Sequence, residues 1–149
     1  MQVDFGIKIE KVERVDTELI AGIQKLFPQL TQYSPIPKEI DLAKIVASDT
    51  TSIWLAKNKT GVILGMLNLA IYRTTTGIHA WIEDVVVDQN ARRQGIAAQL
   101  THAAVEHAKE KGAKAVSLTS RPAREAANLH YIKLGFEKVE TNLYRMRLD

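Results

Sequence analysis

A chain of 149 residues has the usual size of one domain, so we expect residues 1–149 to fold as a single domain. The composition, 46% hydrophobic and 25% charged, is typical of a soluble globular protein and excludes a disordered chain. No cysteine is present, which excludes disulfides, thiolate metal ligands and a cysteine nucleophile. The net charge of +3 is too small to indicate a dedicated nucleic-acid binder, and a small anionic ligand fits it equally well.

Membrane insertion and export are not indicated by the sequence. No apolar run approaches the roughly 18 residues that a membrane span needs. Residues 1–5 lack a basic region followed by an apolar core, which a secretory leader would show. We therefore expect a cytoplasmic protein with no membrane partner.

The first third of the chain predicts one strand and two helices. Apolar and polar residues alternate over residues 6–12, at the period of a half-buried strand. From there apolar residues recur at helical spacing, with Asp16 or Thr17 as the N-cap and Pro28 as the stop. After a proline-containing loop, a short second helix is expected over residues 40–46.

The middle of the chain predicts three antiparallel strands. Strand-like segments cover residues 52–57, 62–72 and 78–87, the last rich in aromatic and β-branched residues. Turn residues separate them at 58–61 and 74–77. Consecutive strands joined by such short turns pair as an antiparallel meander.

The last third predicts alternating strands and helices. A helix follows Gly95, a short apolar strand is expected at 115–119, and a further helix is expected to start at residues 120–122, with a proline in its first turn. Residues 136–139 and 143–148 predict a closing pair of strands. The whole order predicts a mixed α/β domain.

The junction between the third meander strand and the helix after Gly95 favours an anion. Unpaired N–H groups and the dipole of a helix N-terminus attract negative charge, and Gly95 and Ala97 leave no bulk between a phosphate and the backbone. Arg92 and Arg93 add positive charge. No Gly-Lys-Ser/Thr closes the loop and no three-glycine pattern is present, so nucleotide hydrolysis and hydride transfer lose support.

Two motifs at this point resemble the GNAT family of N-acetyltransferases. Arg92-Arg93-Gln94-Gly95-Ile96-Ala97 resembles the family's acetyl-coenzyme A signature, Gln/Arg-x-x-Gly-x-Gly/Ala, and it stands between the expected strand and helix. Tyr131-Ile132-Lys133-Leu134-Gly135-Phe136 resembles the family's Tyr-x-x-x-Gly-Phe, with Ala127 at the small position before it. The resemblance implies the GNAT acyl-CoA N-acyltransferase fold, a mostly antiparallel splayed sheet flanked by helices, with the cofactor between residues 82–87 and 115–119.

The resemblance also implies a reaction, the transfer of an acetyl group from acetyl-coenzyme A to a primary amine of a small molecule, peptide or protein by direct attack. Glu83 is then the candidate base, directly or through water, although a water relay from another residue is an alternative. Asp84 should face the other way, unless a bulge intervenes. By the same resemblance, the backbone N–H of Val85 or Val86 would stabilise the developing oxyanion, and Val87 would pair with the pantetheine amides.

The remaining expected cofactor contacts come from the two motifs. Tyr131 occupies the position from which the family protonates the departing thiolate. The chain departs from the family where Arg124 replaces the usual pantetheine-binding Asn, and Asn128 shares one helical face with Arg124 and Tyr131; which of the two substitutes is open. The pyrophosphate would be held by the signature residues Arg92, Arg93, Gln94, Gly95, Ile96 and Ala97.

Structural explanations compete with several of these roles. Glu83 could be a solvated or ion-paired carboxylate, and Tyr131 a core aromatic. His79 alternates onto the face of Trp81 and Glu83, so it is either structural or a lining of the acceptor site. Arg92 and Arg93 could be ordinary surface charges. The four histidines lack the spacing of a metal site, so we expect no metal.

The acceptor and the assembly are not determined by the sequence. Residues 17–46, which would shape the acceptor site, hold no signature that chooses among polyamines, aminoglycosides, amino acids and protein amines. An alternative function is a non-catalytic acyl-coenzyme A sensor or partner-dependent module of the same fold, although Glu83 and Tyr131 argue against it. A clustered cationic face with interleaved aromatics is lacking, so no nucleic-acid partner is expected. A homodimer is possible through pairing of edge strands.

Overall fold

The computed structural model describes residues 5–148, which divide into two units that are described separately below. The first unit ends at Leu118 and the second begins at Thr119. Residues 1–4, which carry most of the stretch inspected for a leader, lie outside the described residues. Within residues 5–148, no helix is both long and apolar enough to cross a bilayer.

A five-stranded sheet in the order β1-β2-β3-β4-β5 forms the centre of the first unit. The first four strands pair antiparallel, and β5 pairs parallel with β4, so the sheet is mixed. The predicted meander is confirmed, with a tight turn between the longest two strands. The strands are β1 (Lys8–Lys11), β2 (Thr51–Lys57), β3 (Ile63–Thr74), β4 (Gly77–Val87) and β5 (Val116–Ser117).

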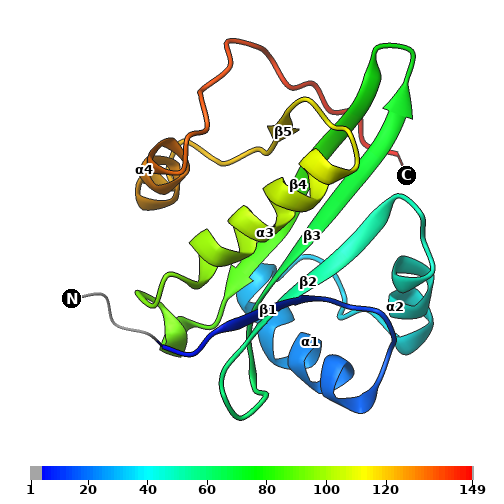
Figure 1. Ribbon diagram of the computed structural model, residues 1–149, viewed down its shortest axis with the longest axis vertical. Helices are drawn as coiled ribbons and strands as arrows, with labels where there is room; N and C mark the ends of the chain where they lie inside the picture. The colour runs from blue at the N-terminus through cyan, green and yellow to red at the C-terminus, as the bar shows by residue number, and fades with distance from the viewer. Residues whose placement is uncertain (1–4, 149) are drawn as a thin grey trace. The chain divides into compact units, whose positions relative to one another are not determined.

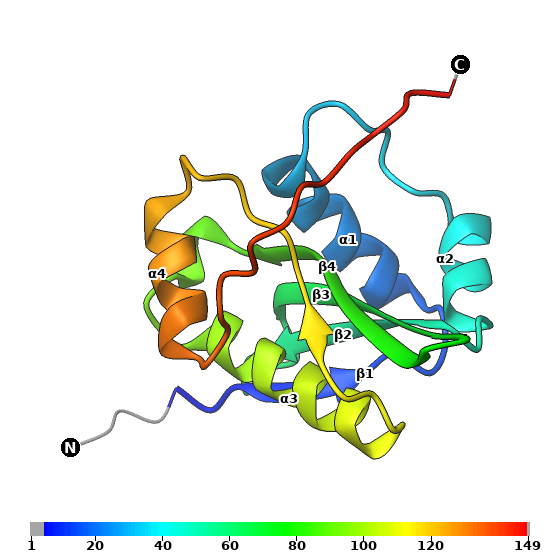
Figure 2. The same cartoon turned by 90° about the horizontal axis from the view of Figure 1, so that it is seen from above.

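Helices cover both faces of this sheet. Helix α1 (Thr17–Leu30) and helix α2 (Glu39–Val46) lie on one face, and α3 (Ile96–Glu110) lies on the other (Figures 1 and 2). The core beneath α1 and α2 takes two residues each from β2 and β3 and one from β4. Those of β2 alternate, as the period of two predicts, whereas those of β3 are three residues apart because the β2–β3 register shifts between Ala56 and Lys57. This cluster consists of Val12, Leu19, Ile23, Leu26, Leu42, Ile53, Leu55, Ile63, Met66 and Val86.

Helix α1 starts where the sequence predicts and ends later. The carboxylate of Asp16 accepts a hydrogen bond from the N–H of Leu19 at 2.8 Å, which satisfies one free donor of the first turn. The prediction that Pro28 stops the helix is wrong, because the helix continues to Leu30. Proline lacks one N–H, but the last turn is still closed by the N–H of Thr31, which donates to the carbonyl of Phe27 at 3.1 Å.

Helix α3 approaches the sheet closely at Gly65 of β3. A Cβ placed on Gly65 would lie 3.0 Å from Cγ2 of Ile96 and 3.2 Å from Cδ1 of Leu100. Both side chains are buried, so the first turns of α3 rest directly on the β3 backbone. This close packing fixes where the N-terminus of α3 lies relative to the end of β4.

The second unit contains one regular element, α4 (Glu125–Lys133), among residues 119–148. The predicted start at residues 120–122 is wrong, because Pro122 lies in the loop before the helix. The predicted strands at 136–139 and 143–148 are also wrong, since neither segment forms a strand. Their strand-like alternation has no hydrogen-bonded neighbour in the sheet, and a strand needs one to satisfy its backbone.

Candidate active site

A β-bulge lies near the end of β4. Asn68 of β3 is paired with Glu83, and Met66 is paired with Val86. Between these pairs, Asp84 and Val85 of β4 lie opposite the single β3 residue Leu67. Asp84 has a φ of 52°, in the left-handed region that non-glycine residues enter at a cost. Bulges of this kind bend a strand and redirect its side chains.

The bulge places both carboxylates on the same face of the sheet. Asp84 was expected to face away from Glu83 unless a bulge intervened, and the bulge does intervene. Asn68, opposite Glu83, donates from its Nδ2 to Oδ2 of Asp84 at 2.9 Å. Beyond the bulge Val86 packs into the core under α1 beside its partner Met66, so the strand resumes its alternation shifted by one residue.

The pKa of Glu83 is raised above its ordinary value. Partial burial of its carboxyl group disfavours the charged form most, and the nearby negative charge of Asp84 adds to this. A carboxylate with a raised pKa holds a proton more firmly, which makes it a better general base for an amine at neutral pH.

Strands β4 and β5 separate immediately before Glu83. Among the described residues, β5 pairs with β4 only at Ala80 and Trp81. From Ile82 to Val87 the corresponding edge of β4 has no partner in the β5 ladder. This is the splayed sheet that the sequence resemblance implies, and it leaves those backbone N–H and C=O groups of residues 82–87 that do not pair with β3 available to an extended ligand.

The loop after β4 is anchored to α1. Asp88 is buried, and its carboxylate accepts from Nζ of Lys25 at 2.8 Å and from the N–H of Asn90 at 3.2 Å. The hydrogen bond from Lys25 is the largest of the effects that lower the pKa of Asp88 below its ordinary value. The N–H of Gln89 donates to Oε1 of Gln29 at 2.9 Å. These contacts hold the start of the loop that leads to the signature residues 92–97 at a fixed place.

The N-terminus of α3 has the features of an anion site. Gly95 is its N-cap residue, with a φ of 74° and no side-chain cap, so the first N–H groups of this helix have no side-chain acceptor. Arg93 is also left-handed, with a φ of 66°. Alternating left-handed residues turn successive N–H groups toward one point, the concave shape that binds phosphates. A Cβ on Gly95 would meet nothing within 4 Å.

The six signature residues differ in what they expose. Arg92 and Arg93 are exposed charges, and Gln94 and Ala97 are half-buried. The Ile96 side chain is buried against β3, so this residue can offer a ligand only its backbone N–H. The three valines of the predicted backbone contacts, Val85, Val86 and Val87, all lie at or after the bulge, on the stretch of β4 that has no β5 partner.

The predicted residues of the second unit lie together on α4 and the residue before it. Tyr131 is half-buried, its ring packs edge-on against Phe136 at 5.8 Å, and burial raises the pKa of its hydroxyl. Nδ2 of Asn128 donates to the carbonyl of Arg121 at 2.9 Å. Arg124 is the exposed N-cap residue, and its charge partly offsets the effect of burial on Tyr131.

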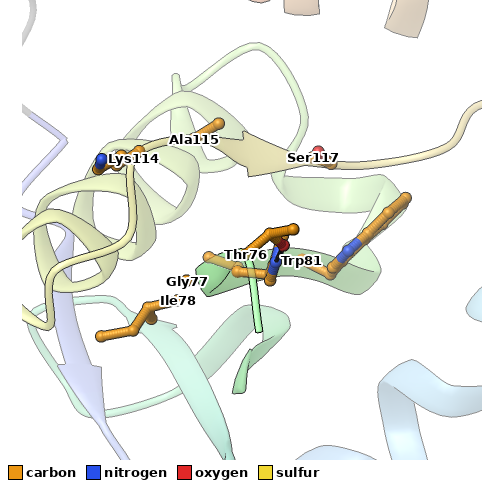
Figure 3. Close-up of a pocket in the computed structure, with 9 residues that line it drawn as sticks. Thr76, Gly77, Ile78, Trp81, Lys114, Ala115 and Ser117 are labelled. Carbon is orange, nitrogen blue, oxygen red and sulfur yellow. Dashed lines mark hydrogen bonds between the residues drawn. The ribbon is translucent and has the colours of Figure 1, made fainter. Parts of the chain in front are cut away.

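A hollow of about 180 Å³ lies against the first half of β4 and the residues around β5 (Figure 3). Trp81 lines it, two positions before Glu83 along the strand. His79 also lines it, but its Nε2 is held by the hydroxyls of Thr74 and Thr76 at 2.8 and 2.9 Å. These bonds and its stacking on Tyr72 favour the structural explanation for His79 over proton relay.

Sequence reasoning missed four residues that hold this site in place, namely Asn68, Lys25, Gln29 and Asp88. Lys25 and Gln29 are spaced i, i+4 on α1, which signals a shared face but not what that face contacts. Asp88 is the first polar residue after an apolar strand, and a buried carboxylate there requires a partner. Asn68 interrupts the apolar run of β3, and that interruption is the signal that was available.

The described residues of the first unit fit acetyl-coenzyme A. The uncapped α3 N-terminus suits its phosphates, and the unpaired β4 edge suits the amides of its pantetheine arm. The acetyltransferase (GNAT) family model matches residues 19–136, most of the chain. The chain belongs to the GNAT acetyltransferase family. Its mixed sheet, splayed after Trp81, and its two-sided helical cover are those of a GNAT fold.

Solved structures share this fold at low sequence identity. An aminoglycoside acetyltransferase from an uncultured soil metagenomic sample, in complex with trehalose, has a TM-score of 0.81 at 24% identity over 97% of this chain and 99% of that one. Aminoglycoside N-acetyltransferase AAC(6')-Iy in complex with CoA has a TM-score of 0.79 at 19% identity, covering 95% and 94%.

A transcriptional regulator from Bacillus halodurans C-125 has a TM-score of 0.77 at 28% identity, covering 95% of this chain and 99% of that one. A search of curated proteins by sequence gave no match. The similar structures thus include enzymes and a protein described as a regulator, and they support the fold without choosing an acceptor.

Proposed function

We propose that this protein transfers the acetyl group of acetyl-coenzyme A to a primary amine of a small molecule or peptide. The observation that carries the proposal is the bulge in β4, which presents Glu83 beside a strand edge without a β5 partner, directly before the uncapped N-terminus of α3. One continuous segment thereby supplies a base, a backbone edge and a phosphate cradle.

In the proposed reaction Glu83 takes a proton from the acceptor ammonium, directly or through one water. The freed nitrogen lone pair attacks the thioester carbonyl carbon, a C–N bond forms, and the C–S bond breaks with its electron pair leaving on sulfur. The N–H of Val85 or Val86 stabilises the negative oxygen during this step. Tyr131 is protonated at neutral pH, and burial raises its pKa further. It donates its proton to the leaving sulfur, and it is reprotonated by the proton that the nitrogen loses as the amide forms.

The cofactor contacts are divided among three segments. The N–H groups at Gly95, Ile96 and Ala97, with the side chains of Arg92, Arg93 and Gln94, hold the pyrophosphate. Val87 pairs with the pantetheine amides through its backbone. On α4, the side-chain amide of Asn128 donates one hydrogen bond to the carbonyl of Arg121. Its own side-chain oxygen, or the exposed guanidinium of Arg124, provides the contact that the family's usual Asn makes.

The acceptor is an amine whose class the fold does not select. The relative in complex with CoA acts on aminoglycosides by its name, and a small hydroxylated amine is therefore part of the proposal. The hollow lined by Trp81, two positions before Glu83 along β4, gives part of such a molecule space. We further propose that the chain works as one domain over residues 1–149, in the cytoplasm, and that it can form a homodimer.

The test is thiol release from acetyl-coenzyme A by the purified protein against a panel of polyamines, aminoglycosides, amino acids and peptides. We expect saturable, amine-dependent release with one class preferred, and loss of release with Glu83→Gln. Tight binding of acetyl-coenzyme A without thiol release for any amine would support the alternative, a non-catalytic acyl-coenzyme A sensor. One of the similar structures is described as a transcriptional regulator, which agrees with that alternative. Absence of both binding and release would overturn the proposal.

A further inference from the structure

Asn68 is a polar residue in the apolar middle of β3, and it makes one hydrogen bond across the sheet. It pairs with Glu83 in the strand register, yet its Nδ2 donates to the next residue, to Oδ2 of Asp84 at 2.9 Å. Only the NH₂ end of an amide can pair with a carboxylate, so the chemistry fixes which end faces Asp84.

The other end of the same amide is unsatisfied. Oδ1 of Asn68 is buried and has no hydrogen-bond partner within the described part of the chain. A buried acceptor without a partner destabilises the folded state. For folding alone, an apolar side chain of similar size would serve better at this position, so the bond to Asp84 is what the amide contributes.

The bond is made at the point where the β4 backbone leaves regular geometry. Asp84 is the left-handed residue of the bulge, and its side chain is tied to β3 by Asn68. This tie keeps the Asp84 carboxylate beside Glu83 and fixes the extra residue of β4 in one arrangement. Without it, an exposed carboxylate on a bulge is free to rotate into solvent.

Asp84 is the charged group that acts on Glu83 in the first unit. On β3 the charged residue Arg73 is paired with Ile78, five positions away from Glu83, and β5 carries no charge. On α1, Lys25 is bound to Asp88, and α3 covers the opposite face of the sheet. The charge of Asp84, added to partial burial, raises the pKa of Glu83.

We propose that Asn68 is a positioning residue of the acetyl-transfer site, whose bond to Asp84 fixes the bulge that presents the Glu83 carboxylate to the acceptor amine. The inference rests on the proposed role of Glu83 as the base. Asn68 acts only through Asp84 and the bulge, and it contacts no reacting atom.

The first test separates positioning from folding. Asn68→Leu removes the hydrogen bond and the unsatisfied carbonyl together. We expect kcat to fall about 10- to 100-fold, as for small misplacements of a catalytic group, with the KM for acetyl-coenzyme A unchanged and Tm unchanged or raised. Ile71→Val, in the same strand and away from the bulge, is the matched control, and it should lower Tm slightly with kcat unchanged. A purely structural Asn68 would show a lowered Tm and an unchanged kcat per folded molecule.

The second test uses opposite shifts of the acidic limb of the kcat/KM profile. With Asn68→Leu the Asp84 carboxylate is no longer held beside Glu83. Its repulsion of the Glu83 charge weakens, the pKa of Glu83 falls, and the acidic limb moves to lower pH. With Asn68→Asp a third carboxylate is added, and the limb moves to higher pH. Asp84→Asn keeps a side-chain partner for Asn68 but removes the charge. It should therefore move the acidic limb to lower pH, and its loss of kcat should be smaller than that of Asn68→Leu.

Carboxyl-carbon NMR titration of Glu83 in the same variants provides a readout that needs no turnover. The expected result is a Glu83 titration that moves down in Asn68→Leu and up in Asn68→Asp. If the wild type releases no thiol with any amine, the proposed function fails, whereas the NMR result still decides whether Asn68 acts on Glu83. A wild-type kcat and an unmoved Glu83 titration in Asn68→Leu, in an active enzyme, would overturn the positioning role.

Discussion

The candidate site residues of the two units are held in different ways. In the first unit Glu83 is fixed by pairing with β3, its neighbour is tied to Asn68, and the loop after β4 is bound to α1 by an ion pair and a hydrogen bond. In the second unit Tyr131 and Asn128 lie on one short helix, and the contacts described for them come from within a few residues along the chain.

The apolar surface of the two units differs in the same sense. The first unit buries many large apolar side chains between helices and sheet, although Tyr33 and Ile40 are 92% and 63% exposed. In the second, Leu143, Tyr144, Met146 and Leu148 are 69%, 86%, 84% and 90% exposed. Contacts between residues far apart in sequence fix catalytic geometry more firmly than local ones, so we expect substitutions near the bulge to have larger effects than those on α4.

The largest effect is expected for Glu83→Gln. Removing the base should lower kcat/KM by about 10²- to 10⁴-fold, while the Kd for acetyl-coenzyme A stays unchanged. Because the pKa of Glu83 is raised and the base must be deprotonated, wild-type kcat/KM should fall as pH drops through that pKa, and the variant should lose this dependence. Thiol release over a pH series is the measurement. The exposed Glu106→Gln is the control, and an equal loss there would remove the special role of Glu83.

Tyr131→Phe should have a smaller effect. We expect kcat to fall about tenfold to 100-fold, less than general acid catalysis usually gives, because a thiolate is a good leaving group. The ring contact with Phe136 does not need the hydroxyl, so Tm should not change. Steady-state kinetics and thermal unfolding measure both. A kcat equal to that of the wild type would make Tyr131 a packing residue.

Gly95→Ala tests the phosphate cradle by itself. At a φ of 74° alanine is strained, so we expect a loss of about 1 kcal/mol in stability, and a Kd for acetyl-coenzyme A raised about tenfold or more, since the methyl group enters the open space at the helix start. Gly61→Ala is the matched control, with a φ of 86° and equally open surroundings in the β2–β3 turn. It should show the same strain and an unchanged Kd. Equal Kd values for the two variants would contradict the cradle.

Lys25→Met should have the smallest effect on activity and a measurable one on stability. It leaves the buried Asp88 carboxylate without its main partner, and since half of Lys25 is exposed we expect a loss of about 1–2 kcal/mol in the free energy of unfolding. The depressed pKa of Asp88 adds stability above the unfolded-state pKa of about 3.9, and this is lost as pH falls toward the folded-state value.

Urea unfolding of Lys25→Met at neutral and acid pH measures this difference, which should shrink as the solution is acidified. Lys44→Met, exposed on α2, is the control and should change stability little. A loss that does not depend on pH would show that Lys25 acts through packing of its stem and not through Asp88.

Most of the first unit could be predicted from local patterns. Turn residues around Gly61 and Gly77 and the aromatic and β-branched residues of β4 predicted the meander. The residues flanking Gly95 predicted the strand, loop and helix of the cofactor segment. The bulge could not be predicted, because a one-residue insertion in a register depends on how Asn68, Glu83 and Val86 pair across two strands.

The second unit shows where local patterns fail. Alternation at 143–148 indicates a strand only if another strand offers its edge, and the sheet of the structure ends at β5. Pro122 suits the first turn of a helix, but the helix begins only at Glu125, after the loop whose carbonyl at Arg121 receives the Asn128 amide. For α4, the sequence pattern predicted a helix correctly but not the residue at which it begins.

An amide NMR titration of the wild-type protein with acetyl-coenzyme A tests directly whether the junction of β4 and α3 binds this cofactor. We expect saturable shifts at the N–H groups of Gly95, Ile96 and Ala97 and along residues 82–87, with smaller changes at the β3–β4 turn, at the opposite end of β4. Saturable binding that leaves residues 95–97 unshifted, or no binding at all, would contradict the assignment of this junction as the acetyl-coenzyme A site.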